Sequence, residues 1–188
     1  TLSNLRSEGE IDERDFLDRA ELLCSMGRTV MISNFQEYYR VVEYFSAYTK
    51  ARMGLAMGVS NLVDIFDEKY YRHLSGGILE AFGKLFYRDL KVYLYPMKDE
   101  DGNVVNSENL MVHPRMKELY KFFKFNGKLE DIPNVDEELL NIFSREVLKL
   151  ISKGKPGWEP MLPVGIAEMI KQNHLFGYDP KKEPAGQV

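Results

Sequence analysis

The amino-acid sequence predicts an α/β fold, with an open parallel β-sheet covered by helices and a helical C-terminal region. Two short apolar stretches predict buried strands, "RTVMISNF" over 28–35 and "ARMGLAMGV" over 51–59. A third stretch, "LKVYLYP" over 90–96, alternates apolar and polar residues as a half-covered strand does. Because helical patterns separate the three stretches, we expect parallel strands joined by helical crossovers.

The composition is that of a globular protein with one domain. The 188 residues are 44% hydrophobic and 29% charged, with a formal net charge of −4, and a chain of this length buries a sizeable core. The acidic balance disfavours electrostatic binding to nucleic acid or to an anionic membrane surface, so we expect neither partner. No apolar run reaches the roughly 18 residues that a membrane span needs.

The single cysteine, Cys24, indicates a reducing compartment, and we expect the chain in the cytoplasm. Its neighbours Leu22, Leu23 and Met26 predict a buried, unreactive thiol. The chain begins at Thr1 rather than at a methionine, so we expect it to be part of a longer protein. The missing part of that protein, or a second copy of the chain, is then an expected partner.

The N-terminal half is predicted to alternate helices and strands. A first helix spans Glu13–Met26 and ends at Gly27, with Asp12 as its N-cap and Ile11 packed on Phe16. A strand at Thr29–Ser33 follows. The next helix has apolar side chains at helical spacing, namely Tyr38, Val41, Val42, Phe45 and Tyr48.

After the second strand, Ser60 is expected to cap a third helix, and Gly76-Gly77 open a fourth. Leu90, Val92 and Leu94 then lie on one face of the third strand. The stretch 97–109 contains Asp101-Gly102, which favours a turn or a small hairpin that leaves the sheet.

The rest of the chain reads as helical: 113–127, 136–154, and a closing helix. In the middle helix Leu140, Phe143, Val147 and Ile151 share a face, and Gly154 ends it. Trp158 is expected to anchor the packing before the closing helix. That helix is expected to start at Pro163, to carry Val164, Ala167 and Ile170 on its apolar stripe, and to end at Gly177.

These elements predict a linker at 1–10, a single α/β domain at 11–178 and a tail at 179–188. Within the domain, 11–96 forms the sheet, 97–109 is an excursion and 110–178 is helical. The arrangement is Rossmann-like. The residues expected in the core are Val30, Ile32, Val42, Phe45, Leu55, Phe66, Phe82, Leu94, Phe143, Val147 and Ile170.

Small polar residues follow two of the predicted strands. Ser33-Asn34 comes after the first, and Gly58 with Ser60-Asn61 comes after the second. Ligands of open parallel sheets bind outside the carboxyl ends of the strands, where helix N–H groups hold phosphate or carboxylate. A binding crevice formed by both loops is one interpretation; ordinary N-capping of the next helices is the other.

Two further stretches are weaker candidates. Gly76-Gly77 opens a helix but lacks the spacing of a phosphate-binding loop. The run "DEKYYRH" over 67–73 brings acids, tyrosines and a histidine together, which is one interpretation for a small-molecule enzyme, and a solvated helix end is the other. The histidines His73, His113 and His174 have no metal-like spacing, so no metal site is expected.

The stretch "IFSREVLKLISKGKPGWEPMLPVGIAEMIKQNHLFGY" over 142–178 resembles the C-terminal signature of nicotinate/nicotinamide-nucleotide adenylyltransferases. The positions in step with that signature are Ile142, Ser144, Val147, Gly154, Leu162, Pro163, Ile166, Ile170, Leu175 and Phe176. In that family the signature serine and arginine bind ATP phosphates at a helix start. The resemblance therefore implies a role for Ser144, with Arg145 as a substitute phosphate ligand, and ATP with magnesium as the ligand.

The family's H-x-G-H loop corresponds here to "ISNFQEYYR", which contains no histidine. The resemblance therefore implies a nucleotide-binding domain that is catalytically degenerate, and a nucleotidyltransferase-like enzyme if it is active. The alternative is a non-catalytic interaction or scaffolding domain of a larger protein. In that case the surface aromatic residues contact the partner, and they are expected to be Tyr70, Tyr71, Tyr93, Tyr95 and Phe123.

Overall fold

The chain is organised as two compact units. The computed structural model describes residues 13–182. Unit 1 combines the two ends of the chain, Thr1–Asn34 and Asn141–Val188, and unit 2 is the segment Phe35–Leu140 between them. The single domain expected over 11–178 therefore comprises two compact units, each with a hydrophobic core of its own.

Unit 2 contains an open sheet of three parallel strands. The strands are β1 (Gly54–Gly58), β2 (Lys91–Tyr95) and β5 (Leu129–Asp131), in the spatial order β1-β2-β5. In the register of the central strand, Leu94 pairs with Met57 on one side and with Asp131 on the other. The α/β class and the open parallel sheet predicted from the sequence are confirmed.

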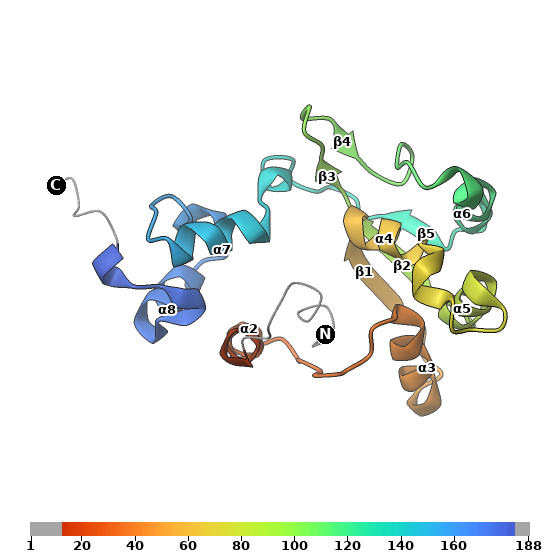
Figure 1. The fold of residues 1–188 in the computed structure, drawn as a ribbon, viewed down its shortest axis with the longest axis horizontal. Coiled ribbons are helices and arrows are strands. Elements are labelled where there is room, and N and C mark those ends of the chain that lie inside the picture. Colours follow the sequence, from red (N-terminus) through yellow and green to blue (C-terminus); the bar gives the residue numbers. More distant parts are fainter. Residues whose placement is uncertain (1–12, 183–188) are drawn as a thin grey trace. The chain divides into compact units, whose positions relative to one another are not determined.

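The strand order explains why the helices cover one face of this sheet. From β1 to β2 and from β2 to β5 the chain moves in the same direction, and crossovers between parallel strands are right-handed. Both crossovers must therefore lie on the same face. Figure 1 shows the crossover helices to one side of the strands: α4 (Val59–Ile65), α5 (Gly77–Leu85) and α6 (Lys117–Phe125).

The alternation along β2 fits this two-layer arrangement. Val92 and Leu94 are completely buried beneath the helices, whereas Lys91 and Tyr93 on the opposite face are half-buried and Tyr95 is exposed. The strand order of a doubly wound sheet reverses and places helices on both faces. Within the described strands the order does not reverse, so unit 2 has an accessible sheet face, which we call the open face.

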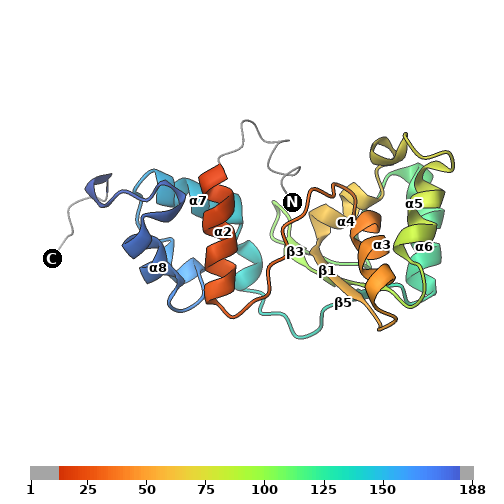
Figure 2. The ribbon, with the colours of Figure 1, turned by 90° about the horizontal axis from the view of Figure 1, so that it is seen from below.

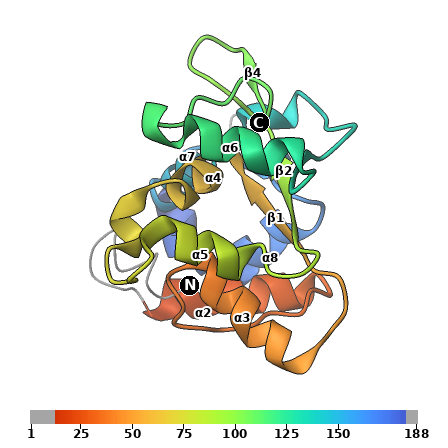
Figure 3. The same ribbon diagram turned by 90° about the vertical axis from the view of Figure 1, so that its right-hand side faces the viewer.

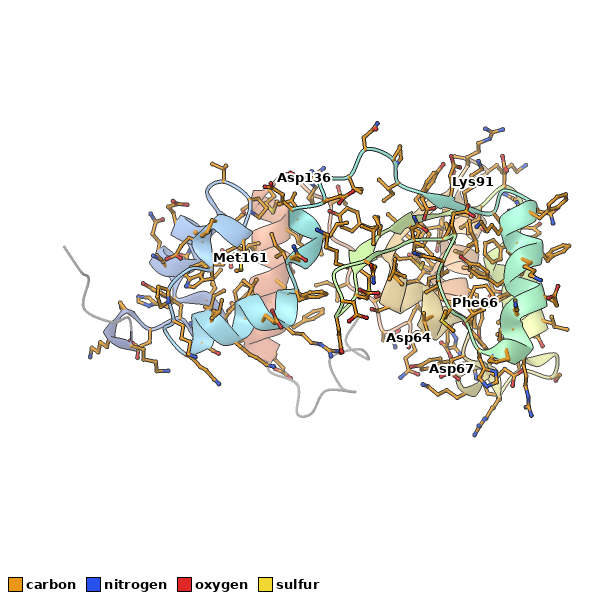
Figure 4. All side chains as sticks on the ribbon, turned by 90° about the horizontal axis from the view of Figure 1, so that it is seen from above. Asp64, Phe66, Asp67, Lys91, Asp136 and Met161 are labelled. Atoms are coloured by element: carbon orange, nitrogen blue, oxygen red, sulfur yellow. The ribbon has the colours of Figure 1, made fainter. Side chains whose placement is uncertain are left out.

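The helices of unit 2 all begin on the same side of the sheet. Helix α3 (Tyr38–Tyr48) leads into β1, α5 leads into β2, and α6 leads into β5. Since the strands are parallel, each helix must start near the carboxyl ends of the strands and finish near their amino ends. Figure 3 shows α3, α5 and α6 running in the same direction, and in Figure 4 α6 extends from the end that carries Asp67 to the end that carries Lys91.

Aromatic rings fill the layer between the helices and the sheet. Phe82 packs edge-to-face on Phe66 and on Phe123, with ring centroids 4.9 and 5.2 Å apart, and Phe86 stacks on Phe123 at 4.2 Å. Tyr120 is also buried, and its hydroxyl donates to the Ser107 carbonyl at 2.7 Å. A buried hydroxyl without such a partner would cost about 1–3 kcal/mol, so this contact stabilises the packing of α6.

The excursion after β2 is a small antiparallel hairpin of β3 (Met97–Lys98) and β4 (Val104–Val105), as predicted. Asp99 closes its turn by accepting hydrogen bonds from the N–H groups of Asp101 and Asn103. The segment after the hairpin is tied to the sheet by Asp131, whose carboxylate accepts from the N–H and the hydroxyl of Ser107 at 2.9 and 2.6 Å.

Unit 1 is helical in its described part. Figure 2 shows α2 (Glu13–Ser25), α7 (Ser144–Ser152) and α8 (Ile166–Asn173) side by side. Trp158 is 1% exposed and confirms the predicted packing anchor. Short 3₁₀ turns occur in the described parts of both units, at Glu68–Tyr71 (η1), Pro114–Met116 (η2), Leu139–Asn141 (η3), Glu159–Met161 (η4), Leu175–Gly177 (η5) and Pro180–Lys182 (η6).

The predicted strand at Thr29–Ser33 is wrong. The segment is extended but pairs with no described strand, and Met31 and Ile32 are 43% and 54% exposed. A β-strand is stabilised by hydrogen bonds to a neighbouring strand, and the three apolar residues of this segment, Val30, Met31 and Ile32, have no described strand to pair with. The true third strand, β5, was missed because its three residues show no pattern of their own.

The predicted core is confirmed at Val42, Phe66, Phe82, Leu94, Val147 and Ile170. It is wrong at Ile32, Phe45 and Phe143, which are exposed, while Val30 and Leu55 are half-buried. Phe45 lies on the outer face of α3, where the apolar pattern is wider than the buried stripe. Phe143 precedes α7, because the helix predicted over 136–154 is broken before Ser144.

Several predicted details differ at helix ends. Cys24 is exposed rather than buried, since its side of α2 faces solvent. Gly58, not Ser60, is the N-cap of α4. The closing helix starts at Ile166, after Gly165 in a left-handed conformation, which leaves Pro163 and the fully exposed Val164 outside it. The residues Asp12 and Ile11 lie outside the described part of the chain.

Replacing glycine by alanine should change the free energy of unfolding in opposite directions at two positions, Gly83 and Gly154. Gly83 lies within α5 with open space around its α-carbon, so Gly83→Ala should stabilise the protein by about 0.5–1 kcal/mol. Gly154 has a φ of 62°, and a Cβ there would lie 2.5 Å from the Lys182 carbonyl oxygen. Gly154→Ala should therefore destabilise unit 1, and urea unfolding of both variants measures the difference. A neutral Gly154→Ala would contradict this packing.

Because Tyr120 of α6 is buried, we expect the protein to lose stability at alkaline pH. Burial raises the pKa of Tyr120 to about 12, above its unfolded value of about 10. The neutral phenol therefore stabilises the fold fully below pH ~10, and this contribution is lost as the pH rises towards 12. Urea unfolding from pH 8 to 11 should show a shallower decline for Tyr120→Phe than for the wild type. Tyr48→Phe, at a position 76% exposed, is the control and should follow the wild type.

Candidate functional site

The carboxyl side of the sheet in unit 2 carries the polar residues that follow β1. Here α4 begins directly after β1, with Gly58 as its N-cap and no side chain capping it. Asn61 donates from its amide nitrogen to the Tyr38 hydroxyl at 2.7 Å, and the Ser60 hydroxyl lies 3.8 Å from the Met97 sulfur. Gly58, Ser60 and Asn61 therefore all lie at the start of α4.

The other predicted site residues belong to unit 1. Ser33 and Asn34 lie in the extended segment before α3, because no strand precedes them. Ser144 and Arg145 are the first two residues of α7. The crevice expected between two equivalent Ser-Asn loops requires two strand ends, and only β1 supplies one.

A hollow of about 450 Å³ lies between the start of α5, the 3₁₀ turn before it and the start of α6. Its floor is largely apolar, with Tyr71, Ile78, Met116 and Leu119, and Glu68 stands on its rim. Arg72 and Arg115 also line it, from elements far apart in the sequence. Among the described residues, neither guanidinium has a carboxylate within ion-pair distance. We call this site the arginine hollow.

The start of α5, beside this hollow, stabilises a carboxylate. The Gly76 N–H donates to the Glu80 side chain at 2.9 Å, and Lys84 approaches the same carboxylate at 3.1 Å. The pKa of Glu80 is lowered, first by the Gly76 hydrogen bond and then by that of Lys84. The amino end of a helix favours negative charge, and this contact demonstrates it here.

A second polar group, which we call the Glu37 network, lies beside the turn between η1 and α5. The Glu37 carboxylate, 10% exposed, lies 3.2 Å from Arg40 and 3.7 Å from His73. The Tyr39 hydroxyl shares a hydrogen bond with His73 Nε2 at 3.2 Å and accepts one from Arg40 at 3.4 Å. The pKa of Arg40 is raised, first by its hydrogen bond to Tyr39 and then by Glu37. These contacts join the start of α3 to the turn.

The residues of the run 67–73 have different roles in the structure. Asp67 caps the 3₁₀ turn η1 by accepting from the Lys69 N–H at 3.0 Å, and the hydrogen bond of the Lys69 side chain lowers its pKa. Tyr71 is buried, donates to the Ile65 carbonyl at 2.9 Å, and has its pKa raised by burial. Arg72 contributes its guanidinium to the arginine hollow, which Glu68 and Tyr71 also line, and His73 belongs to the Glu37 network.

The other histidines have local roles. His113 Nδ1 accepts from the Arg115 N–H at the start of η2, and His174 ends α8 in a left-handed conformation. Among the described residues, no group of three or more histidine, cysteine, aspartate and glutamate side chains is placed to hold a metal ion.

The aromatic residues expected on the surface divide into two sets. Tyr71 and Phe123 are buried in the core of unit 2, because both pack on Phe82. Tyr70 and Tyr95 are exposed, at 42% and 39%, and Tyr93 is half-buried on the open face.

The sequence singled out the carboxyl side of the sheet, and of the residues that line the arginine hollow it offered Gly76-Gly77 and the run 67–73 only as weaker candidates. Arg72 was seen only as part of a charge run, and Arg115 and Glu37 not at all. A weak signal existed: each of the three lies beside a predicted helix start, where the topology places all such starts together. Assigning those helices to neighbouring parallel strands would have found them.

Comparison with family models, with curated proteins and with solved structures gave no match to this chain. In the part of the chain that the structure describes, no helix has both the length and the apolar character to cross a membrane.

The Glu37 network predicts a measurable stability cost. Glu37→Gln removes the charge that pairs with Arg40 and His73, whose side chains are 47% and 44% exposed and therefore partly screened. We expect a loss of about 1 kcal/mol in the free energy of unfolding, measured with urea. The matched control is Glu43→Gln, since Glu43 is 47% exposed and lies 3.8 Å from Lys84. Equal effects of the two substitutions would contradict a stabilising network.

Proposed function

We propose that unit 2 is a Rossmann-like binding domain for a small phosphate-bearing ligand, of the nucleotide class, which it holds in the arginine hollow. The observation that carries the proposal is the pair Arg72 and Arg115, which line one hollow while, among the described residues, neither guanidinium has a carboxylate within ion-pair distance. Guanidinium groups bind phosphate through two parallel hydrogen bonds, which makes arginine the usual residue for this task.

The rest of the hollow supports a nucleotide rather than a bare anion. Its floor of Tyr71, Ile78, Met116 and Leu119 offers apolar and aromatic surface to a base or sugar. Ligand sites commonly combine such a floor with a few convergent polar groups. The volume of about 450 Å³ lies within the range of small-molecule pockets.

The proposal keeps the ligand class implied by the resemblance to adenylyltransferases and changes the residues that bind it. The phosphate ligands are Arg72 and Arg115, which lie at the 3₁₀ turns before α5 and α6. They replace Ser33, Asn34, Ser144 and Arg145 in this role. Gly58, Ser60 and Asn61 lie on the same side of the sheet, at the start of α4. What is proposed is binding, with Mg-ATP as the first ligand to test.

Calorimetric titration with Mg-ATP, nicotinate mononucleotide and NAD tests this function. At least one should bind with a dissociation constant in the micromolar range, which corresponds to about −8 kcal/mol. Arg72→Gln and Arg115→Gln should each weaken binding about ten-fold or more, because each removes one charged ligand of the phosphate. Arg28→Gln in unit 1 makes the same charge change at an exposed position and should leave the affinity unchanged.

Two results would overturn the proposal. Heats equal to dilution for all three compounds would exclude a nucleotide site in this chain. If Arg28→Gln weakened ligand binding as much as Arg72→Gln and Arg115→Gln do, the binding would depend on the net charge of the protein and not on a site in the arginine hollow.

A further inference from the structure

A second hollow, of about 500 Å³, lies at the amino side of the sheet, away from the arginine hollow. Its lining comes from the first residues of two adjacent strands and the loops that lead into them: Arg52, Met53, Gly54, Asp89, Lys91 and Tyr93. Lys91 and Tyr93 are alternate residues of β2 and so belong to the open face. We call this site the tyrosine hollow.

Tyr93 lies against the neighbouring strand at a glycine. A Cβ on Gly54 would be 2.9 Å from Cε2 and 3.2 Å from Cδ2 of the Tyr93 ring, closer than side chains pack. The ring can occupy this position only because residue 54 has no side chain. The glycine therefore leaves room for an aromatic ring on an accessible sheet face, in a hollow that Arg52 and Lys91 also line.

The loops around this hollow are basic, although the whole chain carries a net charge of −4. The segments 48–53, 87–91 and 125–130 lead into β1, β2 and β5, and together carry five basic and two acidic residues, a local charge of +3. Both acids are paired: Asp89 with Arg52 at 2.7 Å, and Glu130 with Lys91 at 2.9 Å. These pairs are exposed, so a bound phosphate can compete for their cations at little cost.

Hydrogen bonds show that the three loops form one continuous surface. Arg88 donates to the Thr49 carbonyl at 3.3 Å, and Lys128 donates to the Arg88 carbonyl at 3.1 Å. Each loop also presents an exposed aromatic side chain: Tyr48 at 76%, Tyr87 at 52% and Phe125 at 93%. Basic and aromatic groups are therefore interleaved across the amino side of unit 2.

We propose that this surface binds a single-stranded nucleic acid, with one base stacked on Tyr93 and the adjoining phosphates on Arg52 and Lys91. Aromatic residues on an accessible sheet stack bases in other single-strand binders, and a basic surface follows the backbone. The basic surface continues past the tyrosine hollow to Lys50, Arg88 and Lys128, which is more than a mononucleotide needs. The proposal is independent of the arginine hollow.

The experiment is a fluorescence-anisotropy titration of a labelled single-stranded oligonucleotide, about ten nucleotides long, with the full chain. An unlabelled abasic strand of the same length and a mononucleotide serve as competitors. The oligonucleotide should bind, and neither competitor should displace it at equal concentration. The logarithm of the association constant should fall with the logarithm of salt concentration with a slope of about −2, as expected for roughly three neutralised phosphates on a single strand.

Variants separate stacking from charge. Tyr93→Leu should weaken binding about ten-fold or more, since it removes the stacking ring. Arg52→Gln, at a side chain 88% exposed, should reduce the salt slope by about 0.7 without affecting the fold. Gly54→Ala should weaken binding by displacing the Tyr93 ring while it removes no functional group. Gly83→Ala, where a Cβ meets open space, is the matched control and should bind as the wild type does.

The outcomes distinguish this proposal from the nucleotide site. The double variant Arg72→Gln/Arg115→Gln should bind the oligonucleotide normally; if it does not, the two hollows form one site and the proposal fails. Equal binding of the abasic strand would exclude base stacking, and equal competition by the mononucleotide in that double variant would assign the tyrosine hollow to a free nucleotide. No binding of the oligonucleotide at low salt overturns the proposal outright.

Discussion

The fold of unit 2 depends on the central strand β2 and on the direction in which the chain crosses it. Val92 and Leu94 have no exposed surface, so burying this one face of β2 drives the packing of the helices onto the sheet. With the order β1-β2-β5, right-handed crossovers leave that face as the only one the connecting helices can cover. The accessible opposite face and the common direction of α3, α5 and α6 both follow from this constraint.

The same constraint gives the two ends of the sheet different chemistry. At the carboxyl side, helix starts collect groups that hold negative charge, such as the Gly76 N–H on Glu80, together with Arg72 and Arg115. At the amino side, helices end and loops enter strands, and there the basic residues and exposed rings are found. A protein with a net charge of −4 can in this way present two local surfaces suited to anions, because net charge describes the sum and not the distribution.

What the sequence could predict was local. The alternation of Leu90, Val92 and Leu94, the glycines that open α5, and the Asp101-Gly102 turn each encode their structure within a few residues, and each was predicted correctly. What failed depended on distant partners. The stretch 29–33 has the composition of a strand but no neighbour to pair with, while Leu129–Asp131 has little pattern but lies beside β2.

The candidate sites also differ in whether they depend on local sequence or on residues far apart in the chain. Gly58, Ser60 and Asn61 were identified because they follow a legible strand. The arginine hollow joins Arg72 to Arg115, and the tyrosine hollow joins Arg52 and Gly54 to Tyr93. The crossovers between parallel strands bring these residues together, so their spacing along the sequence does not reveal that they are neighbours.

The sheet of unit 2 has two outer edges, on β1 and on β5, that pair with no other described strand. Such edges are templates for pairing between molecules, and natural proteins protect them against aggregation. Here β5 is only three residues long and includes Glu130 and Asp131, with Pro133 following soon after. On β1, glycines at both ends limit the length of a regular, flat edge. The short, charged character that made β5 hard to recognise from the sequence thus also makes it a poor template for pairing with another molecule.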